Sequence, residues 1–199
     1  MSEHDHDHEH DHDHEHEHDE PEEDARAEAE ARRRFALGQI RQYGDPALRL
    51  VAHEVVEFDD DLRRLVDRMT TLMHEAQGVG LAATQVGVLR RLFVFDPDGE
   101  GSRVIVNPVV VESKDENATD DEGCLSLQGV RVPVERSVGI TLEGKDANGE
   151  DVRWELDEYG SRVVQHELDH LDGVLIIDRT DDEHRKEALA TLRPRAVLR

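Results

Sequence analysis

The chain has 199 residues, of which 48 are acidic and 24 are lysine or arginine, so its formal net charge is −24. This acidity excludes direct DNA binding, which needs clustered basic residues, and it excludes attraction to an anionic membrane surface. The acidic N-terminus has no apolar run that would indicate a signal peptide, and the single cysteine excludes an internal disulfide, so we expect a cytoplasmic protein.

Residues 1–34 form an acidic tail that we expect to be disordered. Its first thirty residues contain eight histidines, fifteen acidic residues and one arginine, with almost no apolar surface to bury. The pattern HExxH occurs there twice, beginning at His8 and at His14, but no apolar face accompanies either copy. We interpret both copies as accidental, although alternating imidazoles and carboxylates would bind Zn²⁺ or Ni²⁺ weakly.

Residues 35–199 are long enough to form one folded domain. Apolar residues recur at steps of three and four in residues 59–77, which predicts an amphipathic helix. Short β-rich runs follow, separated by turn residues, at 92–95, 104–106, 109–111, 138–142 and 152–156. The last two runs read as a hairpin, and a final helix is predicted for residues 181–192. Strands without regular βαβ alternation predict an α+β fold.

Another helix is predicted for residues 157–172, with Asp157 as its cap and Gly173 at its end. On a helical wheel, His166, Glu167 and His170 share a broad face with aliphatic side chains. The opposite side is a narrow polar stripe made of Arg162, Gln165, Asp169 and Asp172.

Two buried imidazoles and a carboxylate would need a compensating charge. Histidines at positions i and i+4 can bind one metal ion, and the intervening glutamate can act on a water molecule. The alternative is a pair of core histidines that are satisfied by hydrogen bonds. The apolar surroundings and the spacing favour a metal site.

Two histidines leave the coordination sphere of a metal ion incomplete, so a third protein ligand is needed. One candidate lies downstream, Glu187 or Glu183 on the final helix, as in a zincin-type protease. The other is Cys124, within DEGCLSLQG, because a thiolate is a strong ligand even though a lone buried cysteine is usually inert. A metal-binding protein without catalytic activity is a further hypothesis.

Three segments resemble the signature motifs of the peptide deformylases and occur in the family's order. They are GVGLAATQ at residues 78–85, EGCLS at 122–126 and QHELDH at 165–170, and the likeness extends from about residue 40 to about residue 192. The resemblance implies small antiparallel or mixed sheets packed around a central helix that carries HExxH, with a C-terminal helix. It also implies a hydrolase that removes the formyl group from the N-terminal formylmethionine of nascent polypeptides and releases formate.

The resemblance further implies a role for individual residues. Cys124, His166 and His170 would hold one divalent metal ion, commonly Fe(II), which Zn, Ni or Co can replace. Glu167 would act as the proton-transferring base and acid. The backbone N–H of Leu125 and the side-chain amide of Gln85 would stabilise the oxyanion.

The expected partner is a formylmethionyl nascent peptide. In the family the glycine-rich stretch pairs with the substrate backbone like an added strand. The residues expected to contact substrate are Val79, Gly80, Gly123, Arg131, Tyr159 and Val163. The short basic C-terminus suggests a transient contact with the ribosome.

Overall fold

The computed structural model describes residues 20–193, and no helix among them is long and apolar enough to cross a membrane. The described residues contain four α-helices, seven strands and three short 3-10 helices, η1 to η3. In chain order these elements are α1 (Glu20–Gln39), η1 (Pro46–Arg49), α2 (Asp60–Glu75), β1 (Gly80–Ala82), η2 (Ala83–Val86), β2 (Leu92–Phe95), β3 (Arg103–Ser113), β4 (Asn117–Gly123), β5 (Arg131–Ser137), β6 (Gly139–Lys145), β7 (Asp151–Asp157), α3 (Glu158–Leu171), η3 (Ile176–Asp178) and α4 (Asp182–Leu192).

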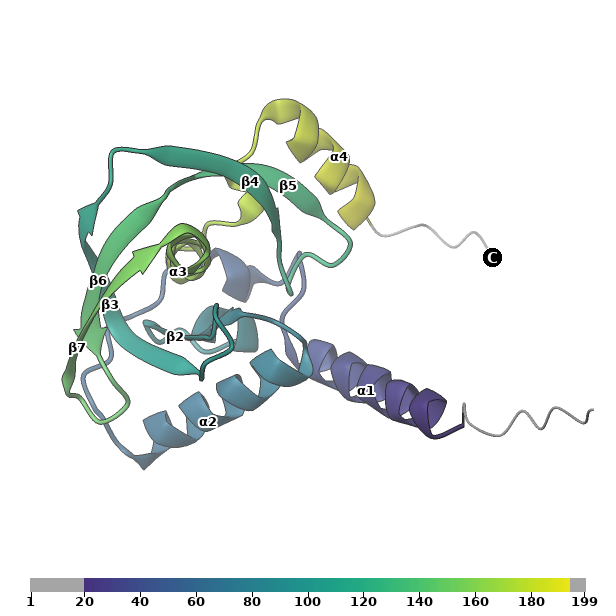
Figure 1. Ribbon diagram of the computed structural model, residues 1–199, viewed down its shortest axis with the longest axis horizontal. Coiled ribbons are helices and arrows are strands. Elements are labelled where there is room, and N and C mark those ends of the chain that lie inside the picture. Colours follow the sequence, from purple (N-terminus) through teal and green to yellow (C-terminus); the bar gives the residue numbers. More distant parts are fainter. Residues whose placement is uncertain (1–19, 194–199) are drawn as a thin grey trace, which may run out of the picture.

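The strands form two antiparallel sheets that curve around α3 (Figure 1). The larger sheet has the order β1-β2-β3-β6-β7, and β4 pairs with β5 in the smaller one. The predicted hairpin is confirmed as β6–β7, in which Leu142 lies opposite Trp154. The predicted α+β fold around a central helix, with a helix at the C-terminal end, is therefore confirmed.

Two of the predicted strands are one in the structure. The runs at 104–106 and 109–111 both belong to β3, whose pairing with β6 shifts in register between Val106 and Val109. Asn107 has a positive φ of 53° there, and its side chain bonds both the N–H and the C=O of Val55. This local bulge is why the pattern looked interrupted.

Helix α2 confirms the amphipathic pattern of residues 59–77. Asp59 caps it by accepting a 2.9 Å hydrogen bond from the N–H of Leu62. Its apolar face, which includes Leu62 and Met69, is buried against β1 and β2. This packing holds the segment that follows α2, and that segment enters the site.

Helix α3 lies between the two sheets. One side packs on the larger sheet through Val164 and Leu171, which join a core cluster with Phe93. The other side contacts β5, which in turn packs on η3 and α4 through residues such as Val132 and Ile176. A helix enclosed in this way has no fully solvated face.

Two expectations about this helix were wrong in part. Gly173 does end it in a left-handed conformation, with φ of 72°, but the Asp157 side chain caps no N–H and pairs with Lys114 instead. The polar stripe opposite the histidines is largely covered, since Asp169 is buried and Arg162 and Gln165 are half-buried. The smaller sheet accounts for this, because its strands β4 and β5 had not been predicted.

The expected disorder of residues 1–34 is wrong from residue 20 onward. Helix α1 covers Glu20–Gln39, and the part of the tail before it lies outside the described residues. Alanine, glutamate and arginine dominate this segment and have high helix propensity. Ala36, Leu37 and Ile40 anchor its end in the same core cluster as α2, so the helix is fixed to the domain at one end.

Candidate metal centre

Cys124, His166 and His170 converge although the cysteine lies more than forty positions before the histidines. One ligand atom from each of the three residues lies within 4.8 Å of the other two ligand atoms. The Sγ atom of Cys124 is 3.2 Å from Nε2 of His170. Cys124 follows the last residue of β4, and both histidines lie on α3, so the pairing of β4 with β5 against α3 brings the thiol to the imidazoles.

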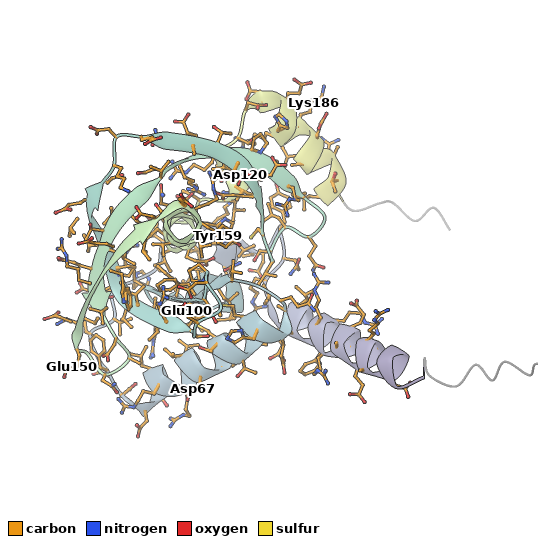
Figure 2. The ribbon with its side chains drawn as sticks, viewed as in Figure 1. Asp67, Glu100, Asp120, Glu150, Tyr159 and Lys186 are labelled. Carbon is orange, nitrogen blue, oxygen red and sulfur yellow. The ribbon has the colours of Figure 1, made fainter. Side chains whose placement is uncertain are left out.

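The other candidates for a third ligand do not reach this cluster. Glu183 and Glu187 lie on α4, where both side chains are exposed. Figure 2 shows Lys186, on the same helix, at the periphery of the molecule and away from α3. The geometry therefore brings Cys124, and neither glutamate, to the histidine pair.

Glu122 orients His166. Its Oε2 atom lies 3.0 Å from Nδ1 of His166, which leaves Nε2 of that ring free to face a ligand. The guanidinium of Arg136 binds both oxygens of Glu122 at 2.9 Å, and Arg162 adds a 2.8 Å contact. Burial raises the pKa of Glu122, but the hydrogen bonds from His166 and Arg136 outweigh it and lower the pKa to about 2, so the carboxylate is charged.

The ion pairs continue behind the site through Asp169. Arg136 also donates a 2.6 Å hydrogen bond to Oδ2 of Asp169, and Arg179 contacts both oxygens of the same carboxylate. The Glu122–Arg136 pair is almost wholly buried. We call Glu122, Arg136, Asp169 and Arg179 the charge network; sequence reasoning missed it because a helical wheel gives no information about the partner segment.

Glu167 is buried in the cavity beside β1. Burial raises its pKa to about 7, and its Oε2 atom has no hydrogen-bond partner among the described residues. A Cβ atom at Gly80 would lie 2.3 Å from Oε1 of Glu167. Gly80 thus leaves the space that this carboxylate occupies, which is the close approach that glycine permits.

Gln85 and Leu125 both lie next to the cysteine. The Gln85 side chain is fixed at both ends: its Oε1 accepts from the Ala82 N–H at 2.8 Å, and its Nε2 donates to Oγ of Ser126 at 3.1 Å. The same Nε2 lies 3.7 Å from Sγ of Cys124. Leu125 directly follows Cys124, so both candidate oxyanion donors adjoin the thiol.

The donor set fits a divalent transition metal. One thiol and two imidazoles are ligands of Zn²⁺, Fe²⁺, Ni²⁺ and Co²⁺, and three protein ligands leave a coordination position for substrate. Burial lowers the pKa of His170 well below its usual value, which keeps its imidazole neutral as a ligand must be. The residues present therefore suit a catalytic metal ion.

A cavity of about 730 Å³ opens onto this cluster, and all the residues expected to contact substrate line it. Tyr159, labelled in Figure 2, lies in the first turn of α3 and is about half exposed. The guanidinium of Arg131 donates to the C=O of Asp121 at 3.2 Å. Arg33 and Leu37 of α1 also line the cavity, which was not predicted. The complete set of expected contact residues on the wall is Val79, Gly80, Gly123, Arg131, Tyr159 and Val163.

Comparison with known proteins gives one consistent result. Residues 37–186 match the family described as polypeptide deformylase. A peptide deformylase of Thermotoga sp. (strain RQ2) is 46% identical over 147 residues, which cover 74% of this chain and 89% of that relative. Peptide deformylase 1 of Corynebacterium glutamicum is 42% identical, covering 81% and 97%. The crystal structure of peptide deformylase from Thermotoga maritima superposes with a TM-score of 0.70, at 46% identity over 71% of this chain and 96% of that one.

Proposed function

Because the chain belongs to the polypeptide deformylase family and is a hydrolase that removes the N-formyl group from nascent polypeptides, we propose that Cys124, His166 and His170 hold its metal ion. The single observation that supports this assignment is the convergence of their ligand atoms within 4.8 Å of one another. We propose Fe(II) as the ion, with Zn, Ni or Co able to replace it. When bound, such an ion polarises a carbonyl oxygen and acidifies a water molecule.

Glu167 is proposed to move the proton. Its buried carboxylate takes a proton from the water that attacks the formyl carbon, and the free Oε2 atom is placed to receive it. The same carboxyl group then returns the proton to the departing amine nitrogen. The C–N bond breaks, and formate and a free amino terminus are released.

Gln85 and Leu125 are proposed to stabilise the negative charge on the formyl oxygen. One Nε2 hydrogen of Gln85 bonds Oγ of Ser126, and the other, whose contact with Sγ of Cys124 is long at 3.7 Å, would turn to the formyl oxygen. The N–H of Leu125 follows the cysteine in the chain. Donors fixed in advance need no reorganisation as charge develops, and losing one typically costs about 10²–10³ in rate.

The cavity walls are proposed to hold the peptide. Val79, Gly80 and Gly123, which all line the cavity, would bond the substrate backbone as an added strand. The methionine side chain would enter between Val79, Tyr159 and Val163. Arg131, exposed at the rim, would contact the peptide further along.

Several wider assignments are also proposals. Residues 35–199 form the catalytic domain, which acts in the cytoplasm on chains that emerge from the ribosome and makes transient contact with it. The histidine-rich tail binds Zn²⁺ or Ni²⁺ weakly; it lies largely outside the described residues. The cytoplasmic location and the ribosome contact are supported by the substrate, because formylated nascent chains emerge from the ribosome in the cytoplasm.

The test is formate release from formyl-Met-Ala by protein purified without oxygen. Wild type should be active, Glu167→Gln should retain its metal ion but lose activity, and Cys124→Ser should lose both. Glu183→Gln, on the exposed face of α4, is the matched control and should equal wild type. Full activity of Cys124→Ser with a normal metal content would overturn the ligand assignment.

A further inference from the structure

Residues 41–43 lie between the two segments that carry the proposed oxyanion donors. The N–H of Arg41 donates to the C=O of Gln85 at 2.7 Å, and the N–H of Tyr43 donates to the C=O of Ser126 at 2.8 Å. We call residues 41–43 the brace. It joins the η2 segment to the loop after Cys124, although these two are about forty positions apart in the chain.

The side chain of Gln42, at the middle of the brace, bonds to the residue after the cysteine. Its Nε2 donates to the C=O of Leu125 at 3.1 Å and to the C=O of Ile40 at 3.1 Å. Its Oε1 accepts from Nε2 of Gln128 at 2.9 Å. Both hydrogens of the amide are used and its oxygen is bonded, so the orientation of the half-buried side chain is fixed.

The Leu125 carbonyl belongs to the peptide unit that decides the shape of a turn. The N–H of Leu127 donates to the C=O of Cys124 at 3.1 Å, which closes a β-turn with Leu125 and Ser126 at its centre. Such a turn changes type when its central peptide rotates, because that rotation exchanges the directions of the central C=O and N–H. Here that N–H belongs to Ser126 and points at Sγ of Cys124, 3.4 Å away.

We infer that Gln42 is a positioning residue for the reaction, which holds the turn of residues 124–127 in the form that aims the N–H of Ser126 at Sγ of Cys124. It reaches neither substrate nor metal ligands itself and acts through the carbonyl of Leu125. This inference rests on the proposed function of Cys124 as a metal ligand, because a hydrogen bond to a ligand sulfur tunes the metal ion. If the turn is released, the Ser126 N–H leaves the sulfur for part of the time, and we expect transition-state stabilisation to fall more than substrate binding does.

The experiment compares kcat and KM for formyl-Met-Ala in the full-length protein. Gln42→Glu keeps the shape of the side chain but replaces the donating NH₂ with an oxygen, and Gln42→Ala removes the side chain. We expect kcat to fall about tenfold in both variants while KM and metal content stay at the wild-type values. Gln39→Ala is the matched control, since it removes a glutamine side chain that bonds Arg68 and does not line the cavity, and its kcat should match that of wild type.

Two variants keep the test decisive if one of them unfolds, and thermal melts will identify such a variant. Wild-type kcat in a folded Gln42→Glu protein would overturn the inference, as would a rise in KM that accounts for the whole loss. An inactive wild-type protein would instead refute the proposed function, so the two failures can be told apart.

Discussion

The carboxylate of Glu122 joins the imidazole of His166 to the guanidinium of Arg136: it lies 3.0 Å from Nδ1 of the one and 2.9 Å from two nitrogens of the other. The imidazole of His166, which we propose as a metal ligand, is thereby held in one orientation by a charge that is itself held in place. Each part of this arrangement can be removed separately.

Replacing Glu122 with glutamine should weaken metal binding. Loss of the negative charge beside His166 lowers the basicity of the ring and loosens its orientation, and changes of this kind typically cost about 10- to 100-fold in affinity. Titration against a competing chelator measures the effect. Glu135→Gln, an exposed residue of β5 bonded to Asn117, is the control; an equal loss in both variants would contradict a specific role for Glu122.

Replacing Arg136 with alanine should destabilise the fold by about 3–5 kcal/mol, because the carboxylates of Glu122 and Asp169 would be left buried without their shared partner. The free energy of unfolding in urea tests this value. Arg153→Ala breaks an exposed pair with Glu143 and should leave stability almost unchanged. If the two variants were equally stable, the charge network would have no structural importance.

A methyl group at position 80 should slow the reaction without removing the metal ion. The Cβ atom of Gly80→Ala would overlap the carboxylate of Glu167, which must then move. We expect a lower kcat with an unchanged metal content. Gly160→Ala is the matched change in α3, where the nearest atom is 3.6 Å away; it should stay active and gain about 0.5–1 kcal/mol of stability, since alanine suits a helix better.

Truncating Leu37 should destabilise the whole domain. This side chain is buried in the core cluster of α2, and a buried leucine-to-alanine change typically costs about 2–5 kcal/mol. Phe35, which is 71% exposed two residues earlier on the same helix, should tolerate alanine. Urea unfolding of both variants decides whether α1 is part of the folded unit, and no loss for Leu37→Ala would show that it is not.

How far the sequence predicts the structure depends on whether a residue's role is set locally. Helices α2 and α3 were predicted because their apolar residues recur with a helical period, and the histidine pair could be placed on the correct face for the same reason. Strand β4 was not predicted, since all but one of its residues are exposed and it lacks an apolar alternation. Strand β5 was also not predicted; its buried Val132 and Val134 alternate, but Pro133 lies between them, and a proline argues against a strand. The sequence of an exposed strand such as β4 does not indicate which other strand it pairs with.

The same limit applies to the site. The pairing of Cys124 with two distant histidines came from a family resemblance, and spacing alone left Glu183 and Glu187 open. Asp169 and Arg162 looked like surface residues on the wheel because their burial comes from a sheet contributed by another part of the chain. No sequence pattern pointed to Gln42, since its inferred role depends on a single hydrogen bond to the carbonyl oxygen of Leu125, a distant residue in the chain.

Helix α1 leaves the body of the protein and points outward (Figure 1). Its 20 residues span about 30 Å at 1.5 Å per residue, and only its last turns reach the cavity, through Arg33 and Leu37. The first turn of α1 is therefore separated from the cavity by several turns of the helix. A fluorescent reporter attached to the first turn of α1 would lie about 20 Å along the helix from Arg33, the first of its residues to line the cavity.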